Sequence, residues 1–248
     1  MRIDERRQPP STQGPRLRRV GHKGADLIAP GNTYESFDAA LAAGVDMIEF
    51  DILPERGTER LLLAHDYEDA AGRAPLTLEE GLAHLASEAF TGIELDVDLK
   101  LPDYELRVLE ALRAYGVLDR TMISSHFGLS LATIRAAAPS IRLGWSVPRV
   151  RSDPFRSRAW TLPAHVLVLI AKSGLPKRAS RAIRAGRCDA IMVHWRIVSP
   201  KLIEAVATAG GELYVWTVDE VEMLRRFEAM GATGVITNDP RLFAQLAA

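Results

Sequence analysis

The stretch GVDMIEFDILPERGTERLLLAHD, residues 44–66, decides the fold prediction for this chain. Residues 45–53 form an almost continuous apolar run, which is typical of a strand covered on both faces in a parallel sheet. Glu49 and Asp51 interrupt the run two positions apart, so both side chains point to one face of the strand, about 7 Å apart. A dozen residues on, the stretch reaches His65. It therefore predicts a buried strand that carries polar chemistry on one face.

Two buried carboxylates on one face are costly unless a partner neutralises them. A hard divalent cation, Mg²⁺ or Ca²⁺, is one such partner, because carboxylate oxygens are its preferred ligands. His65 beside that site is then a candidate acid or base. Alternatively, Glu49 and Asp51 form salt bridges to Lys or Arg, and His65 only ends a strand. The spacing alone leaves both interpretations open.

The composition favours one globular domain of barrel size, with 248 residues, 47% apolar residues and a formal net charge of −1. This charge argues against a nucleic-acid partner and against a polybasic membrane anchor. The single cysteine, Cys188, excludes an internal disulfide and fits a reducing compartment. The longest apolar run, residues 162–171, is interrupted by Pro163 and His165 and is too short to be a transmembrane segment.

Residues 1–19 are polar and contain prolines, and they lack the apolar core of a signal peptide. We expect them to form a flexible leader before a single domain that spans residues 20–248. The expected location is the cytoplasm.

Apolar strands and amphipathic helices alternate along the rest of the chain. The predicted strands are residues 18–24, 45–53, 92–100, 121–126, 141–147, 190–195, 212–218 and 234–237. The predicted helices are residues 34–43, 77–89, 103–115, 129–138, 163–171, 176–185, 199–209, 219–230 and 240–246, and residues 67–74 are predicted to be a polar loop. This order predicts an α/β fold, a closed (β/α)₈ TIM barrel. A doubly wound open sheet is the alternative, although no G-x-G-x-x-G motif follows the first strand.

In a barrel, catalytic groups lie at the carboxyl ends of the strands, so residues from all parts of the sequence meet at one mouth. The polar and aromatic residues at these ends are His22, Glu49, Asp51, Asp98, Lys100, His126, Trp145, His194, Trp195, Trp216 and Asn238. Glu94 and Asp96 share a face with Asp98, and we expect them deeper in the barrel with Arg, Ser or water as partners.

The ordered set of motifs resembles the glycerophosphodiester phosphodiesterase family and, more distantly, spider-venom-type phospholipases D. The motifs are Gly21-His22-Lys23-Gly24, Pro30-Gly31-Asn32-Thr33, Ile48-Glu49-Phe50-Asp51, His65-Asp66, Pro75-Leu76-Thr77-Leu78-Glu79-Glu80, Asp98-Leu99-Lys100, Trp216-Thr217-Val218 and Thr237-Asn238-Asp239-Pro240. The resemblance extends from Val20 over nearly all of the chain. It implies a (β/α)₈ barrel that cleaves glycerol phosphodiesters with a divalent cation, Mg²⁺ or Ca²⁺.

The resemblance also implies the roles of individual residues. The metal ligands would be Glu49, Asp51 and Asp98, and the catalytic pair would be His22 and His65. The substrate would contact Lys23, Lys100 and Trp216.

Three positions depart from the usual family pattern. Lys23 stands where the family usually has Arg, and Lys offers phosphate a point charge rather than a two-pronged contact. Gly31 replaces a usual Glu, and Asp98 replaces a usual Glu with a shorter reach. These departures bear on the substrate more than on the metal and the histidines.

The expected function is metal-dependent hydrolysis of glycerophosphodiesters, or of lysophospholipid headgroups, by histidine acid–base catalysis. Two alternatives are a lyase-type phospholipase D that ends at a cyclic phosphate and a barrel that binds phosphate ligands without turnover. A short loop after His65 and the aromatics Trp145, Trp195 and Trp216 predict an open, partly apolar mouth. Such a mouth would accept a lysophospholipid at least as well as glycerophosphocholine.

Overall fold

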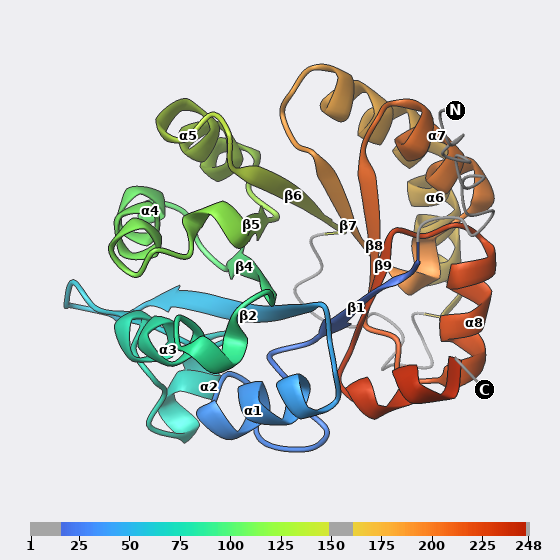
Figure 1. Ribbon diagram of the computed structural model, residues 1–248. Coiled ribbons are helices and arrows are strands. Elements are labelled where there is room, and N and C mark those ends of the chain that lie inside the picture. The colour runs from blue at the N-terminus through green and yellow to red at the C-terminus, as the bar shows by residue number, and fades with distance from the viewer. Residues whose placement is uncertain (1–15, 149–160, 247–248) are drawn as a thin grey trace, which may run out of the picture.

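The computed structural model describes residues 16–148 and 161–246, with the side chains of residues 161–172 excluded. Parallel strands close into a barrel with helices around it (Figure 1), as the sequence predicts. The barrel strands are β1 (Arg18–Gly21), β2 (Met47–Pro54), β4 (Glu94–Leu99), β5 (Thr121–Ser125), β6 (Arg142–Val147), β7 (Ala190–His194), β8 (Glu212–Trp216) and β9 (Gly234–Thr237). Strand β1 pairs with both β2 and β9, which closes the ring.

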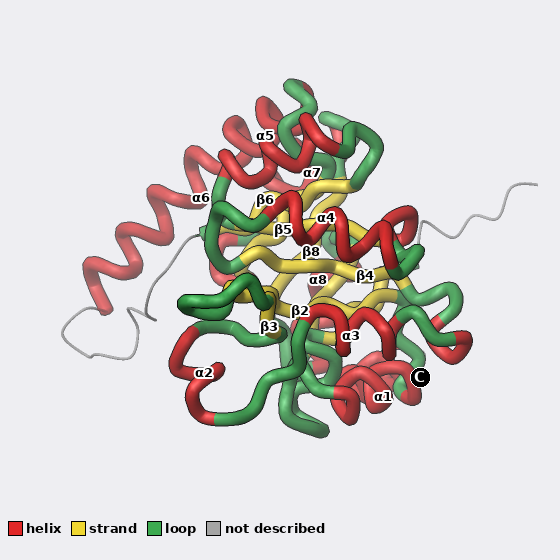
Figure 2. The backbone as a smooth tube through the Cα atoms, turned by 90° about the vertical axis from the view of Figure 1, so that its left-hand side faces the viewer, coloured by secondary structure: helices red, strands yellow, loops and turns green. Residues whose placement is uncertain are grey.

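A ninth strand, β3 (Leu61–Leu62), extends the end of β2 as an antiparallel hairpin. The α-helices are α1 (Tyr34–Ala42), α2 (Tyr67–Gly72), α3 (Leu78–Leu85), α4 (Glu105–Ala114), α5 (Gly128–Ala137), α6 (Thr161–Arg184), α7 (Pro200–Thr208) and α8 (Val221–Ala229). Short 3₁₀ helices are η1 (Glu88–Phe90), η2 (Leu118–Arg120), η5 (Trp195–Ile197) and η6 (Pro240–Leu246). Figure 2 shows the strands inside this layer of helices.

The apolar core has two parts, because each barrel strand sends alternate side chains inward and outward. The larger part lies between the strands and the helices; there Phe37 of α1 packs edge-to-face on Phe50 of β2. The smaller part fills the barrel interior and includes Met47, Met192 and Tyr214. The residues that face the axis above this inner cluster are therefore the ones that reach the mouth.

Three sequence predictions for local structure differ from the structure. Residues 67–72 form helix α2 rather than a loop, because the Asp66 side chain caps the helix by accepting from the N–H groups of Glu68 and Asp69. The helices predicted at residues 163–171 and 176–185 are one helix, α6, which continues through Pro176. The helix predicted to reach residue 89 ends at Leu85, and η1 follows it.

No helix in the described part of the chain is long and apolar enough to cross a membrane. The leader predicted at residues 1–19 lies mostly outside the described residues.

Candidate active site

A cavity of about 280 Å³ opens at the carboxyl ends of the barrel strands. Its lining combines acidic, basic and histidine side chains with a few apolar ones. The lining residues are His22, Glu49, His65, Asp96, Asp98, Lys100, Ser124, His126, Ser146, Pro148, Met192, Trp216, Thr217 and Ile236. Of the eight residues that the sequence proposes for the site, six line this cavity, while Asp51 lies beside it and Lys23 points elsewhere.

Strands β2 and β4 bring the predicted metal ligands together. Their parallel register places Asp51 beside Asp98 and Glu49 beside Asp96. Glu49, Asp51 and Asp98 each offer a carboxylate oxygen, and these three oxygens lie within 4.8 Å of one another. Three buried carboxylates that converge on one point suit a hard divalent cation, because their oxygens are its preferred ligands. The residues present therefore fit the metal that the sequence analysis expects.

Lys100 follows β4 and reaches back over the same carboxylates. Its ammonium lies 2.5 Å from Asp51 Oδ1 and 2.5 Å from Asp98 Oδ2. Ser124, on the neighbouring strand β5, donates to Asp98 Oδ1 at 3.2 Å. The ammonium of Lys100 thus lies beside the acidic cluster, and the side chain lines the same cavity.

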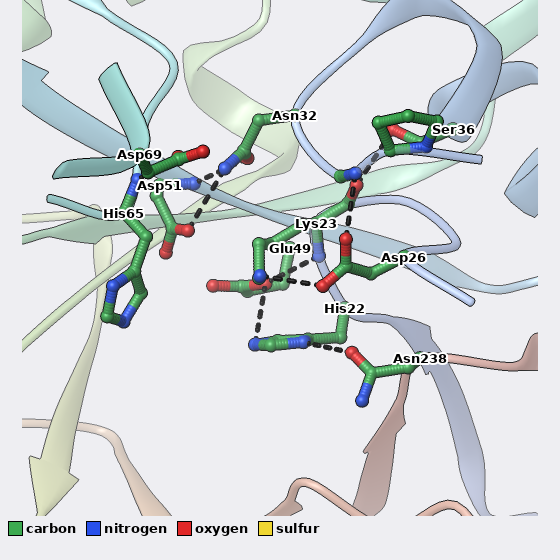
Figure 3. Close-up of polar contacts among 12 residues, drawn as sticks. His22, Lys23, Asp26, Asn32, Ser36, Glu49, Asp51, His65, Asp69 and Asn238 are labelled. Atoms are coloured by element: carbon green, nitrogen blue, oxygen red, sulfur yellow. Dashed lines mark hydrogen bonds and ion pairs between the residues drawn. The ribbon is translucent and has the colours of Figure 1, made fainter. Parts of the chain in front are cut away.

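The segment between β1 and α1 fixes the orientation of both carboxylates on β2. The Lys23 N–H donates to Glu49 Oε2 at 2.9 Å, and the buried Asn32 side chain donates to Asp51 Oδ2 at 3.0 Å. Asn32 Oδ1 in turn accepts from the Asp51 N–H at 3.1 Å. Asn32 has a positive φ of 61°, a conformation that Asn tolerates better than most residues. Figure 3 shows these contacts gathered around Glu49 and Asp51.

The orientation of His22 is set from the opposite end of the sequence. His22 Nδ1 lies 2.5 Å from Asn238 Oδ1, and Asn238 Nδ2 donates to Asp219 Oδ2 at 2.7 Å. Because Asp219 can only accept from the amide, the Asn238 oxygen must face His22. The proton of a neutral His22 ring is therefore on Nδ1, and Nε2 faces the site 3.9 Å from Glu49 Oε2.

His65 comes from the other side of the acidic cluster (Figure 3). The ring Nδ1 of His65 lies 2.9 Å from Asp66 Oδ2. The backbone N–H of His65 donates to Asp69 Oδ2 at 3.0 Å. The Asp66 carboxylate therefore contacts the His65 ring on its Nδ1 side. The His65 side chain is 53% exposed, so its ring is open to solvent.

The electrostatics of the cluster separate the acid–base behaviour of its members. Burial and the negative charge of Asp51 raise the pKa of Glu49 well above its usual range. Burial opposes ionisation of Asp51 too, but Lys100 outweighs it and holds the pKa of Asp51 well below its usual range. Burial and the nearby charge of Lys23 lower the pKa of His22, so its ring is neutral near pH 7.

The two deeper acids of β4 have different surroundings. Glu94 is ion-paired to Arg18 and Arg142, which matches the expected arginine partners. Asp96 is fully buried, and neither of its carboxylate oxygens has a hydrogen-bond partner among the described residues. Burial and the charge of Asp98 raise the pKa of Asp96 to about 8.

Two predicted mouth aromatics are placed differently. Trp216 lines the mouth and meets the His194 ring edge-on at 5.1 Å. Trp145 and Trp195 instead pack against the outer core between strands and helices. Trp145 faces outward because its neighbour Ser146 faces inward, and alternate residues of a strand point to opposite faces. The prediction of a mouth walled by all three tryptophans was wrong.

The Lys23 side chain is not placed where the sequence analysis expected a substrate contact. Its ammonium is paired with Asp26 at 2.7 Å, and the Asp26 carboxylate also accepts from the Gly31 N–H. Sequence reasoning assigned no role to Asp26 or Asp219, and Asp66 appeared only as part of the His65-Asp66 motif. Asp26 and Asp219 follow recognised motifs, but no spacing rule links them to their partners.

Comparison with known proteins places the chain in a family. The model of the glycerophosphoryl diester phosphodiesterase family matches residues 76–242. The chain belongs to this family. A curated glycerophosphodiester phosphodiesterase of Caldanaerobacter subterraneus subsp. tengcongensis is 25% identical over 260 residues, which cover 92% of this chain and 96% of that one. A curated glycerophosphodiester phosphodiesterase of Arabidopsis thaliana is 22% identical, covering 91% of this chain and 71% of that one.

Solved structures of the family share the fold. A glycerophosphodiester phosphodiesterase of Thermotoga maritima matches with a TM-score of 0.67 and 18% identity, covering 93% of this chain and 99% of that one. A phosphodiesterase of Oleispira antarctica, solved with the product sn-glycerol-3-phosphate, matches with a TM-score of 0.69 and 17% identity, covering 92% of this chain and 96% of that one. These matches confirm the (β/α)₈ TIM barrel and the resemblance read from the sequence.

Proposed function

We propose that this phosphoric diester hydrolase cleaves glycerophosphodiesters to an alcohol and glycerol phosphate, with a divalent cation held by Glu49, Asp51 and Asp98. The convergence of these three carboxylates beside Lys100, between two histidines, carries the proposal. When bound, the cation would polarise a phosphoryl oxygen and offset charge that develops on it. Mg²⁺ and Ca²⁺ both prefer oxygen ligands, so the donor set does not choose between them.

Lys100 is the proposed phosphate contact on the protein side. Its ammonium is held at the cluster by Asp51 and Asp98, and these acids with Glu49 outweigh burial and raise its pKa well above the usual range. It therefore stays charged at any working pH and can face a non-bridging phosphate oxygen. Trp216 is the proposed apolar wall for the rest of the substrate, since it lines the same cavity. Lys23 is a weaker candidate contact because Asp26 holds its ammonium.

The two histidines lie on opposite sides of the acidic cluster (Figure 3), which supports an assignment of separate roles. His22, neutral with its proton on Nδ1, presents a basic Nε2 to the site. It would take the proton of the substrate's neighbouring hydroxyl as that oxygen bonds to phosphorus. His65, whose Nδ1 contacts Asp66, would give a proton to the leaving alcohol oxygen as its bond to phosphorus breaks. In the second step, His65 would take a proton from water as the water oxygen bonds to phosphorus, and His22 would return its proton to the glycerol oxygen as the bond that closes the cyclic phosphate breaks.

The test is phosphorus NMR of glycerophosphocholine turnover, with EDTA treatment and addition of Mg²⁺ or Ca²⁺. We expect EDTA to stop turnover and metal to restore it. The His22→Ala and His65→Ala variants should each lose about 10²–10⁴-fold in kcat while they still bind metal by calorimetry. Turnover that survives EDTA or either substitution would overturn the mechanism. Accumulation of a cyclic phosphate would indicate a lyase, and metal binding without turnover of any diester would indicate a binding barrel.

A lysophospholipid substrate has weaker support from the geometry than the deacylated diester. Only Trp216 of the three expected tryptophans lines the mouth, where Met192, Pro148 and Ile236 add limited apolar surface. We therefore expect kcat/KM for glycerophosphocholine to equal or exceed that for lysophosphatidylcholine. The reverse preference would show that an acyl chain finds apolar surface outside this cavity.

A further inference from the structure

A second cavity lies on the outside of the barrel, over strand β6 and between helices α5 and α6. Helix α5 packs against α4, and helix α6 packs against α7. The cavity has a volume of about 620 Å³, within the range of about 300–1,000 Å³ that is usual for small-molecule sites. We define this groove by its lining residues: His126, Gly128, Leu129, Leu131, Trp145, Arg178, Arg181, Ala182, Arg187 and Cys188.

Among the described residues, every charged side chain that lines the groove is positive. These side chains are Arg178, Arg181 and Arg187, and no carboxylate of the described residues lines the groove. Within the described residues, no ion pair joins any of the three to an acid. The nearest acid in sequence, Asp189, is already paired with Arg135 at 2.5 Å. Three guanidinium groups around one cavity repel each other unless an anion lies between them, and guanidinium is well suited to carboxylate and phosphate.

The most exposed apolar side chain of the groove, Leu129, lies at the opposite end from Arg181 and Arg187. Leu129 is in the first turn of α5 and His126 directly follows β5, so both lie toward the carboxyl end of the barrel. Leu129 is 84% exposed, the most exposed large apolar side chain of the described residues. Arg187 precedes β7 and Arg181 lies in the last turns of α6, so both lie toward the amino end of the barrel. Trp145 lies between, with the Arg178 guanidinium 5.4 Å from its ring centre.

We propose that this groove binds an anionic single-chain amphiphile, with its phosphate or carboxylate on the arginines and its chain along Trp145 toward Leu129. Charge complementarity selects the head, and the apolar end explains why a bare anion would not fill the cavity. His126 lines both the groove and the catalytic mouth, so occupation of one is expected to affect the other. The site goes beyond the diesterase function, because it uses none of the residues proposed for catalysis.

The test measures the change in tryptophan fluorescence when the protein is titrated with dodecyl phosphate below its micelle concentration. Dodecyl maltoside and dodecyltrimethylammonium carry the same chain with a neutral and a cationic head. We expect saturable binding of dodecyl phosphate and at least tenfold weaker binding of the other two. Inorganic phosphate alone should bind at least tenfold more weakly than dodecyl phosphate. Equal binding of all heads, equal binding of inorganic phosphate, or no binding would each overturn the proposal.

A matched pair of variants on one helix tests the location. R178Q/R181Q removes two groove arginines, whereas K177Q/R184Q removes two exposed cations of α6 that do not line the groove. We expect the first to weaken dodecyl phosphate binding at least tenfold and the second to change it less than twofold. Equal weakening would show attraction to general positive charge and would overturn the site. All four side chains are exposed, so folding should survive; diesterase activity on glycerophosphocholine provides the check.

Discussion

At the residue scale, the acidic side chains of the mouth differ in how many hydrogen-bond and ion-pair partners they have. Glu49, Asp51 and Asp98 have partners on several sides, whereas Asp96 is buried with neither oxygen bonded among the described residues. A buried carboxyl without donors favours its neutral form, because ionisation in a low-dielectric environment is costly. Asp96 should therefore lower the stability of the protein at neutral pH when no cation is present.

Replacement of Asp96 by Asn should stabilise the protein in EDTA at pH 8, by about 1–3 kcal/mol. The pKa of Asp96 is about 8 in the folded protein and about 3.9 in an unfolded chain, so the folded state binds the extra proton. The destabilisation is thus absent below about pH 4 and grows as the pH rises toward 8. Urea unfolding of wild-type and D96N proteins at pH 4.5 and pH 8 measures it. A variant that is less stable, or a difference that does not change with pH, would contradict this account of Asp96.

Asn238 controls His22 without touching the reacting atoms. Replacement by Ala removes the acceptor that keeps the proton on Nδ1, so a smaller fraction of His22 presents a basic Nε2. We expect kcat to fall by about tenfold or more, as for the loss of other groups that orient a catalytic imidazole. The Asn238 contact also raises the pKa of His22, so the acid limb of the pH–rate profile should move to lower pH. A merely structural role would leave that limb in place.

The D219N variant provides the control for this assignment. With an amide at position 219, the orientation of the Asn238 side chain is no longer fixed by an obligatory acceptor. The same change in pH profile, with a smaller fall in kcat, is expected. A wild-type pH–rate profile in D219N would show that the Asp219 carboxylate is not required to orient the Asn238 side chain.

At the element scale, the turn between β1 and α1 packs so closely that only Gly fits at position 24. A Cβ there would lie 2.6 Å from the Ser36 backbone, and the Gly24 N–H also donates to the Glu49 carbonyl. Gly92 has almost the same positive φ, 87° against 85°, but open space around it. The two positions therefore separate backbone strain from steric clash.

G92A should cost about 1 kcal/mol from the positive φ alone. G24A should cost at least about 2 kcal/mol more, because the clash adds to the same strain. It should also weaken metal binding, since displacement of the turn moves the N–H of Lys23 from Glu49. Urea unfolding compares the stabilities of G24A and G92A. Calorimetric titration with Mg²⁺ compares their metal affinities. Equal effects of the two substitutions would mean that the turn relaxes freely.

Structural features that depend on residues close together in the sequence could be predicted, whereas contacts between distant residues could not. The alternation of strands and helices and the inward pair Glu49 and Asp51 depend on neighbours in sequence, and these predictions agree with the structure. Trp145 was misplaced because a shift of one residue reverses the face of a strand, and IRLGWSV has no clear alternation to fix it. The role of Asn238 could not be assigned, because its partner His22 lies 216 positions away.

At the scale of the whole molecule, the barrel is closed at its amino end by a network of charges. Arg18 of β1 and Arg142 of β6 both pair with Glu94 of β4, and Arg142 also pairs with Glu212 of β8. Each strand of this network is separated from the next by one barrel strand or more, so the pairs join parts of the ring that share no backbone hydrogen bonds. The chemistry of the mouth lies at the other end.

E94Q should destabilise the barrel by about 1–3 kcal/mol, because two arginines lose their common carboxylate while they remain partly buried. Chemical unfolding measures this cost. Metal affinity should stay within about twofold of wild type, since Glu94 lies deeper in the barrel than the proposed cation site. E94Q and D96N alter residues on the same face of β4, but the first should lower the free energy of unfolding and the second should raise it. If E94Q were more stable than wild type, the free energy lost by removing these charges from water would exceed the free energy gained from their ion pairs.

The contact between His22 and Asn238 has a consequence for how the protein is made. During synthesis the His22 segment emerges from the ribosome long before Asn238, at about 5–20 residues per second. Strand β9, which pairs with β1 and β8 and carries Asn238 at its end, is among the late segments to appear. A nascent chain with β1 to β8 already in place would therefore hold its acidic cluster but lack the contact that orients His22, the proposed base. We expect the proposed diester cleavage to begin only when the ring closes.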